Sequence, residues 1–481
     1  MLQQVKPICA LLLLWCSLSV AVEDAKLSDA ERVLAVTKPL EHPRGKRPPL
    51  ILWTPNFPPQ ASDDELERIL KELNTRGIAF LTRWQHGKFE QHAPYAIRIA
   101  QLQKKLGIEI VIDGTGIAHG FYDGTPPTGH VSADGKPFFD SSFFWRPGCP
   151  FAVQSRYAPM RERTEAYLKA YADAGVPVDY WLADWEFDGP EEWNEGWAAA
   201  QRCTRCLEKI PDLAKNFEAF AKAVRAVRSE MQREAFTAPI LKQFPAARVG
   251  NYAIAPHDGH RYWWDFFEQR KEGLPYVREH KALYRPWADE FTPSGYTCAM
   301  PVLYTWYHYA ADYEFKNAQY RWFYPLLKEA TSTARHTPKQ VPSLAFVHWT
   351  TTNPPKEGLP QGFEPMSRAM YQEFLWHALL RGHDGFAMWC PANELEAEVP
   401  AVHEVYAQAQ AFAEFLEQGE PVLWDVPAEP SSVISALKWN NKYLVRRTDF
   451  EPNPQAVRIE IEGKAVSVPP SEGKCQIIGA P

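Results

Sequence analysis

The stretch DYWLADWEFDGP, residues 179–190, combines the composition of a buried strand with three acidic residues at alternating positions. Side chains alternate along a strand, so the acids share one face while the bulky Trp185 and Phe187 share the other. A strand of a parallel barrel has one face toward the barrel interior and one toward the surrounding helices. The two aromatic residues suit the helix layer, which places the acids inside. The acids are Asp184, Glu186 and Asp188.

Short apolar runs of this kind alternate with amphipathic stretches eight times along the chain. The stretch at 63–77 is typical of the helical patterns between them, because it begins with acidic residues and ends at a glycine. Eight strand–helix units in series predict an α/β fold, the (β/α)8 barrel of the TIM type. The expected strands are residues 50–57, 78–84, 108–116, 178–187, 248–255, 296–304, 342–349 and 385–391.

The ends of the chain differ in composition from the barrel. The N-terminus has one lysine, a short apolar run and small residues near Ala21, the pattern of an export signal. This predicts a secreted or periplasmic protein without stable membrane insertion, and a retained N-terminal anchor is the alternative. The C-terminus has alternating strand patterns, an Asn-Asn turn and no helical period. We expect a signal peptide at 1–21, a lead-in at 22–48, the barrel at 49–418 and a small all-β domain at 419–481.

Charge and cysteine content narrow the classes of partner. The formal net charge is −7 and the basic residues are scattered, so no nucleic-acid partner is expected. The pair in RCTRC favours a small disulfide loop between Cys203 and Cys206 over half of a zinc site, because no second Cys or His pair with ligand spacing accompanies it. The two histidines of HDGH, residues 257–260, also lack a distant third ligand. We therefore expect no cofactor and no metal.

The inward acids indicate acid–base chemistry. A carboxyl kept protonated by an apolar wall can donate to a leaving group, and a second acid nearby raises its pKa further. Four long inserts, each after a strand, would gather at the C-terminal rim, where barrel enzymes carry their active sites. The alternative is that the strand ends early and the acids lie in a solvated loop or bind a structural cation. The inserts are residues 117–157, 188–210, 256–294 and 350–365.

The expected seventh strand bears on the choice of nucleophile. It ends in FVHWTTTNPP, residues 346–355, and carries no acid, whereas ordinary retaining glycosidases need a second carboxylate across the sugar. In a substrate-assisted mechanism, the 2-acetamido oxygen of an N-acetylhexosamine attacks the anomeric carbon instead. Glu186 would then be the general acid/base, and Asp184 would orient the acetamido group.

The sequence Asp184-Trp185-Glu186, with Pro190 behind it, resembles the signature of the hyaluronidases of vertebrate and venom type. Further stretches within residues 178–395 are similar to that family in the same order. They are NFEAFAKAV, VGNYAIAPHDG, AMPVLY, LLKEATSTARHTPKQVPSLAFV and GFAMWCPAN. The resemblance implies a barrel endo-glycosidase that acts on an N-acetylhexosaminide by substrate assistance.

Carried over by position, the resemblance implies that Tyr252 and Tyr304 bind around the acetamido group and that Trp389 forms the aromatic wall of the subsite. Asp113 and Asp188 are further candidates for substrate binding, and Asp113 could instead pair with an arginine. The chain lacks the framework cysteines and the cysteine-rich tail of the family. The expected partner is a glycan that contains N-acetylhexosamine.

Three other classes stay open. A non-catalytic glycan-binding barrel would be marked by a missing acid, yet both Asp184 and Glu186 are present. A barrel glycosidase could use a different pair of carboxylates. A metal-dependent amidohydrolase ranks last, because the predicted strands carry no His-x-His.

Overall fold

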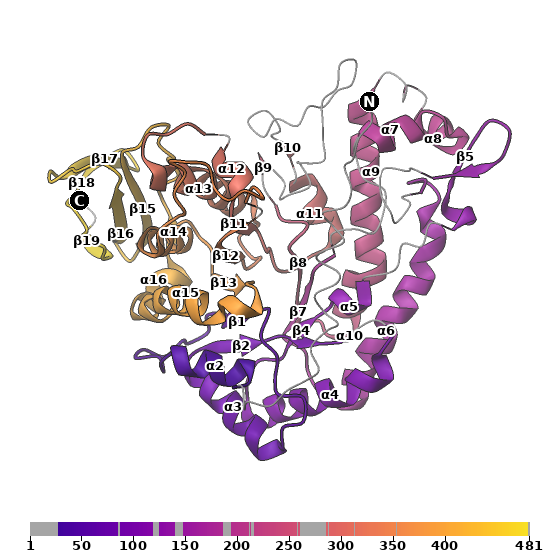
Figure 1. The fold of residues 1–481 in the computed structure, drawn as a ribbon, viewed down its shortest axis with the longest axis horizontal. Helices are drawn as coiled ribbons and strands as arrows, with labels where there is room; N and C mark the ends of the chain where they lie inside the picture. The colour runs from indigo at the N-terminus through magenta and orange to yellow at the C-terminus, as the bar shows by residue number, and fades with distance from the viewer. Residues whose placement is uncertain are drawn as a thin grey trace.

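A computed structural model describes the protein from residue 27 to residue 479, with the exception of residues 85–86, 119–124, 140–147, 186–193, 211, 213–215, 257, 260–284, 287, 312 and 353. Parallel strands form a barrel with helices around it (Figure 1). Each barrel strand lies within or overlaps a stretch in which the sequence predicts one. The barrel strands are β1 (Leu50–Leu52), β2 (Ile78–Phe80) continued by β3 (Thr82–Arg83), β4 (Val111–Asp113), β7 (Tyr180–Ala183), β8 (Arg248–Asn251), β11 (Val302–Trp306), β12 (Leu344–Thr352) and β13 (Gly385–Met388).

The barrel is closed. Parallel pairing follows the chain order from β1 to β8 and again from β11 to β13. Between β8 and β11, the backbone N–H groups of Thr297 and Cys298 donate to the Val249 carbonyl at 2.9 and 3.0 Å. The last strand then pairs with the first, with Ile51 opposite Ala387. The expected (β/α)8 barrel is therefore confirmed.

Helices follow the strands and cover the outside of the barrel. In α3, Ser62 caps the N-terminus by accepting from the Glu65 N–H, and the apolar positions Leu66, Ile69 and Leu73 are buried. These helices are α3 (Asp63–Thr75), α4 (Phe89–Leu106), α6 (Tyr157–Asp173), α9 (Phe217–Gln232) with its π-helical extension (Arg233–Thr237) and α10 (Ala238–Gln243), α13 (Ala318–His336), α14 (Arg368–Leu380), α15 (Leu395–Ala409) and α16 (Ala413–Gln418). In the described part of the chain, no helix is long and apolar enough to cross a membrane.

Shorter elements belong to the segments between barrel strands. They are α5 (Thr115–Ala118), β5 (His130–Val131), β6 (Pro137–Phe138), α7 (Asn194–Ala200), α8 (Thr204–Lys209), β9 (Asp258–Gly259), β10 (Arg285–Pro286), α11 (Ala288–Ser294) and α12 (Tyr307–Ala311). One helix was not expected from the sequence. It is α2 (Asp29–Val36), which contacts α15 and buries Ala30 and Val33 completely.

The alternation of side chains on β7 follows the prediction. Leu182 belongs to the apolar cluster inside the barrel, together with residues such as Tyr252 and Phe346. Trp181 and Trp185 instead belong to the cluster between the strands and the helices, where Trp185 packs edge-on against Phe236 with ring centroids 6.1 Å apart. The parity of β7 therefore assigns Asp184, which follows Ala183, to the inner face.

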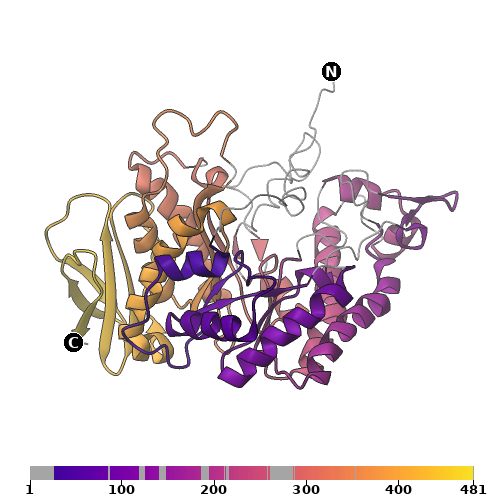
Figure 2. The same cartoon turned by 60° about the horizontal axis from the view of Figure 1, so that its bottom comes forward.

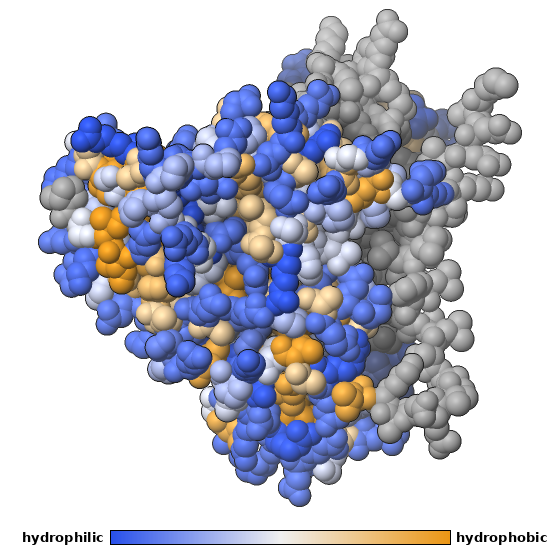
Figure 3. All heavy atoms as spheres, turned by 60° about the vertical axis from the view of Figure 1, so that its left-hand side comes forward, coloured by the Kyte–Doolittle hydropathy of each residue, from blue (hydrophilic) through white to orange (hydrophobic). Residues whose placement is uncertain are grey.

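A separate antiparallel sheet ends the chain. It contains β14 (Glu420–Pro421), β15 (Ser432–Trp439), β16 (Lys442–Asp449) and β19 (Gln476–Gly479), beside a hairpin of β17 (Val457–Ile461) and β18 (Lys464–Val468). The predicted Asn-Asn turn joins β15 to β16, and Asn440 and Asn441 both have the positive φ angles, 46° and 58°, that such a tight turn requires. The outer face on this side is mostly hydrophilic, with separate hydrophobic patches (Figure 3).

The C-terminal sheet packs on α14 through buried polar groups as well as apolar ones. Arg381, which is fully buried just after α14, donates to the Ser435 hydroxyl at 3.0 Å and to the Asp425 carbonyl at 2.6 Å. His377 lies between the hydroxyls of Ser435 and Thr448 at 2.8 and 3.0 Å. The barrel and the sheet therefore complete each other's hydrogen bonding.

His383 gives the fold a defined response to acid. The Ala330 carbonyl can only accept, so Nε2 of His383 carries the proton and donates to it at 3.0 Å, while Nδ1 accepts from the Ser343 hydroxyl at 2.8 Å. Burial of the ring lowers the pKa of His383 from 6.5 to about 4. As the pH falls below 6.5, the unfolded chain therefore takes up a proton that the folded chain refuses until about pH 4.

Between pH 7 and pH 5, the free energy of unfolding of the parent protein should fall because of His383. We predict that in His383→Gln this fall is smaller by about 2 kcal/mol. The measurement is urea unfolding at both pH values. The variant should be less stable at pH 7 but should change less with pH. Leu344→Ala, a cavity at a fully buried neighbour, is the control and should lower stability at both pH values while the difference between them is kept. An equal pH dependence in His383→Gln and the parent would contradict the assignment.

Candidate active site at the C-terminal end of the barrel

Asp184 and Tyr252 meet at the carboxyl ends of adjacent strands. Asp184 follows the last residue of β7, and Tyr252 follows the last residue of β8. The Tyr252 hydroxyl donates to Oδ1 of Asp184 at 2.5 Å, a charge-assisted hydrogen bond that orients the carboxylate. Asp184 is half-buried and Tyr252 is 7% exposed. Two residues that the sequence assigns to one site are thus brought into contact.

Two further side chains fix the backbone around Asp184. The backbone N–H of Asp184 donates to the Thr115 hydroxyl at 2.8 Å. The side-chain amide of Asn251 accepts from the Trp185 N–H and donates to the Trp185 carbonyl, both at 3.1 Å. Asn251 therefore continues the pairing of β8 with β7 beyond the end of the strands, and its own amide is held by Gln232 at 3.1 Å. Sequence analysis missed this residue, although a buried asparagine at a strand end is a recognisable signal.

A row of aromatic rings connects β8, β11, β12, β13 and β1. Phe346 contacts three of them, with centroid distances of 5.1 Å to Trp53, 4.9 Å to Tyr252 and 5.4 Å to Tyr304. Trp389, which is half-buried, stacks against Tyr304 at 6.1 Å with an interplanar angle of 21°. Tyr252, Tyr304 and Trp389, all expected from the sequence, thus belong to one connected row of rings.

Asp113 lies one strand away from Asp184 and has an arginine partner. Its Oδ2 is 3.2 Å from Nε of Arg83, and its Oδ1 accepts from the Thr115 N–H at 2.9 Å. Thr115 thereby connects Asp113 to Asp184 through one residue. The structure shows the pairing of Asp113 with arginine, and substrate binding by Asp113 stays a prediction.

The end of β12 receives an acid from another part of the chain. Glu398 of α15 is fully buried, and its Oε2 accepts from Nδ1 of His348 at 2.9 Å and from the Trp349 N–H at 3.0 Å. Its Oε1 accepts from the N–H of Thr350 at 2.9 Å and from the Thr350 hydroxyl. Both oxygens of this carboxylate are thus engaged by groups of β12, which indicates a structural role for Glu398.

Glu394 lies beside the hydrogen bonds of Glu398, and the Thr350 hydroxyl contacts the carboxylate of Glu394 as well. Partial burial raises the pKa of Glu394, and the neighbouring Glu398 adds to this effect. His348 meanwhile packs edge-on against Trp389 at 4.9 Å and Tyr304 at 5.5 Å. His348, which is held by Glu398, therefore packs against the aromatic row and supports it.

Some predictions fall on residues that the structure does not describe. Glu186 and Asp188 lie outside the described residues, as do the predicted signal peptide at 1–21 and both histidines of the HDGH motif. The assignment of Glu186 as acid/base, and of Asp188 as a substrate ligand, stays a prediction from the sequence.

The predicted disulfide between Cys203 and Cys206 is not formed, and both thiols are free. Instead, these cysteines meet His130 and Cys149, and all four ligand atoms lie within 4.8 Å of one another. Sequence analysis missed the second pair because His130 and Cys149 are far apart in the chain and come together only through the loop around β5 and β6. The four residues, His130, Cys149, Cys203 and Cys206, are called the Cys3His cluster below.

Comparisons with known proteins give only distant likenesses. No protein-family model matches the chain, and a search of curated proteins finds no match. Among solved structures, α-L-fucosidase isoenzyme 2 from Paenibacillus thiaminolyticus is 12% identical with a TM-score of 0.44, over 78% of this chain and 51% of that one. A β-galactosidase from Halorubrum lacusprofundi is 13% identical with a TM-score of 0.48, over 78% and 59%.

A maltogenic α-amylase from Thermotoga neapolitana is 9% identical with a TM-score of 0.41, over 90% of this chain and 96% of that one. The chain thus spans about half to three-fifths of the length of the first two proteins. With TM-scores below 0.5, these likenesses assign neither a family nor an activity to this chain.

We predict that Asn251→Ala destabilises the protein by at least about 2 kcal/mol, because the buried N–H and carbonyl of Trp185 both lose their partner. Urea unfolding of the parent and the variant measures this difference. Asn56→Ala, at an exposed position, is the matched control and should stay within about 0.5 kcal/mol of the parent. Equal stability of the two variants would show that Asn251 does not fix the end of β7.

Proposed function

We propose that this protein is a glycoside hydrolase that cleaves an N-acetylhexosamine-containing glycan with retention of configuration, using the substrate's own acetamido group as nucleophile. The observation that carries the proposal is the contact between Asp184 and Tyr252 at the carboxyl end of a closed parallel barrel. Active sites of such barrels lie at this end. We also propose that the chain is exported, on the basis of the sequence of residues 1–21.

The chemistry needs one proton donor and one group that orients an amide. Glu186 would protonate the glycosidic oxygen while the acetamido oxygen attacks the anomeric carbon and forms a cyclic oxazolinium. Asp184, oriented by Tyr252, would accept from the amide N–H and stabilise the positive charge that develops on the ring. Glu186 would then take a proton from water, which attacks the same carbon and reopens the ring. Two inversions at one carbon give retention.

The aromatic row suits a sugar ring in the substrate. Sugar rings present apolar C–H faces, which pack against flat aromatic surfaces. The half-buried Trp389 and its stacked neighbour Tyr304 supply such a surface across the barrel end from Asp184. A subsite with an acid pair on one strand and an aromatic wall on another would hold the sugar between them.

The hydrogen bonds of Glu398, the acid that approaches β12, favour substrate assistance. A two-carboxylate mechanism needs a carboxylate whose oxygens are available to the sugar or to a water molecule. Glu398, the acid that approaches the end of β12, has both oxygens engaged by His348, Trp349 and Thr350. The substrate's acetamido oxygen would fill the role that this carboxylate cannot.

We predict that Glu186→Gln and Asp184→Asn each lower kcat by about 10²- to 10⁴-fold, while the binding of substrate changes much less. Initial rates on a panel of N-acetylhexosamine-containing polymers and their aryl glycosides measure the loss, and proton NMR of the first product gives its anomeric configuration. Asp173→Asn, at an exposed carboxylate on α6, is the control and should keep full activity. Inversion, or full activity on substrates without the 2-acetamido group, would reject substrate assistance.

Glu394→Gln separates this mechanism from one with a second enzyme carboxylate. Glu394 is the half-buried acid next to Thr350 at the end of β12, so it is the described residue best placed to replace Glu398 in that role. Under substrate assistance, the variant should retain activity within about tenfold of the parent. A loss as large as that of Glu186→Gln would favour a two-carboxylate glycosidase.

A further inference from the structure

The Cys3His cluster joins two rim inserts that are distant in sequence. His130 begins β5 and Cys149 follows the β5–β6 hairpin, both in the insert after β4, whereas Cys203 and Cys206 flank the start of α8 in the insert after β7. The two inserts lie side by side at the rim, on the side of the barrel away from the C-terminal sheet (Figures 1 and 2). None of the four side chains is more than 2% exposed.

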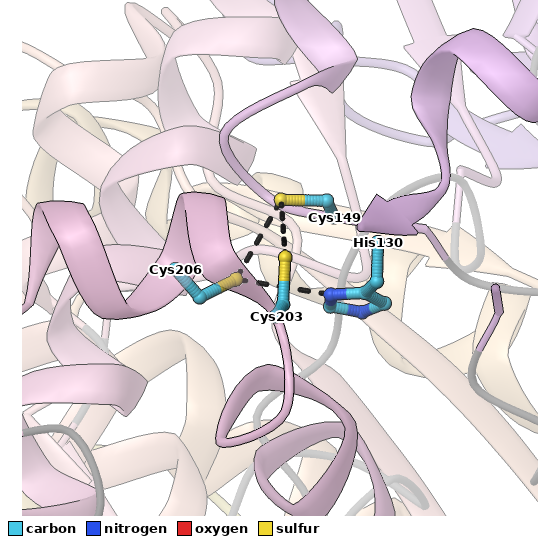
Figure 4. Close-up of side chains that lie close together, drawn as sticks. All are labelled: His130, Cys149, Cys203 and Cys206. Carbon is cyan, nitrogen blue, oxygen red and sulfur yellow. Dashed lines mark hydrogen bonds between the residues drawn. The ribbon is translucent and has the colours of Figure 1, made fainter. Parts of the chain in front are cut away.

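The four side chains point toward a common centre (Figure 4). The Sγ atoms of Cys149 and Cys206 are 3.5 Å apart, and those of Cys203 and Cys149 are 3.8 Å apart. The Sγ atom of Cys206 lies 3.7 Å from Nδ1 of His130. A disulfide would need about 2.0 Å between sulfur atoms. For a tetrahedral zinc site with zinc–sulfur bonds of about 2.3 Å, the sulfur atoms are separated by about 3.8 Å.

We propose that the Cys3His cluster binds one structural zinc ion. Three thiolates and one imidazole are a standard closed set of zinc ligands, and they complete a tetrahedron without an open position. The three distances given above are close to the edges of a tetrahedron around a single ion, and all four ligand atoms lie within 4.8 Å of one another. The site is separate from the carboxylates of the candidate active site, so it does not rest on the proposed glycosidase activity.

Neighbouring groups hold the ligands as a metal site requires. The Val131 N–H points at Sγ of Cys203 at 3.4 Å, and the ring of Phe138 stacks on that of His130 with centroids 5.1 Å apart. Arg205, between the two cysteines of α8, donates to the Gly129 carbonyl at 3.1 Å and so ties α8 to the residue before His130. Such surrounding contacts fix ligand orientation before the ion binds.

The four ligands lie in an apolar environment that the inserts share with a barrel helix. An apolar cluster, which includes the start of α9, surrounds the ligands and is distinct from the clusters of the barrel core. A metal ion with ligands from both inserts would add a cross-link between them. The ion would therefore fix the two inserts that flank the end of β7, where Asp184 lies. The apolar members are Trp197, Ala200, Phe217, Phe220, Ala221 and Val224.

The test is the metal content of the full chain, prepared under reducing conditions without a histidine tag. Elemental analysis by inductively coupled plasma mass spectrometry should give one zinc per chain. Cys149→Ser and Cys206→Ser should each weaken zinc binding by at least about 100-fold in competition with a chromophoric chelator. Cys475→Ser, at a half-buried cysteine outside the cluster, is the matched control and should keep one zinc with the parent's affinity.

Cobalt substitution covers the case in which the serine variants fail to fold. The parent chain, stripped of metal under reducing conditions and given Co²⁺, should show intense thiolate-to-cobalt charge-transfer absorption and the visible bands of tetrahedral Co²⁺, and both should vanish when Zn²⁺ is added. A chain that binds neither ion would overturn the proposal. So would one iron or copper in place of zinc, or a disulfide among these three cysteines in freshly prepared protein.

Discussion

Closure of the barrel, in which β13 pairs with β1, is the constraint on which the site depends. In a closed parallel barrel, each strand has one face toward the interior and one toward the helices, so parity alone decides where a side chain goes. On β7, this parity buries Trp181 and Trp185 under the helices and leaves Leu182 inside. The carboxylate of Asp184 consequently reaches Tyr252 on the neighbouring strand. A slip by one residue would exchange the two sets and remove the site.

The features predicted from the sequence are those governed by local period. Eight apolar runs separated by amphipathic stretches were enough to predict the barrel. The alternation in residues 179–190 was enough to predict that Asp184 points inward. The Asn440-Asn441 turn was also predicted, because its positive φ angles favour asparagine whatever the surroundings. The positions of Tyr252, Tyr304 and Trp389 came from the order of motifs in a resemblance, and the structure shows that they share one row of rings.

The features that were missed depend on contacts between distant parts of the chain. Glu398 is 50 residues from His348, so no pattern around β12 could reveal that an acid approaches it. The partners of Cys203 and Cys206 come from another insert, and the spacing between His130 and Cys149 is typical of no ligand motif. The disulfide prediction failed because it counted only ligands with short spacing. Pairing of loops at a barrel rim is a tertiary event, and hydrophobic period carries no information about it.

Buried Arg381 bears on the order in which the chain can fold during synthesis. Its guanidinium is buried at the end of α14. The groups that accept its hydrogen bonds include the Asp425 carbonyl and the Ser435 hydroxyl, and the ribosome adds these residues some tens of residues later. Burying an unpaired guanidinium costs free energy. The outer surface of α14 therefore cannot reach its final packing while only the barrel residues have been synthesised. The barrel likewise cannot close until β13 has been synthesised, because β1 pairs with it at Ala387. Final assembly of this protein is thus delayed until the C-terminal sheet has been synthesised, so the barrel and the sheet reach their final packing together.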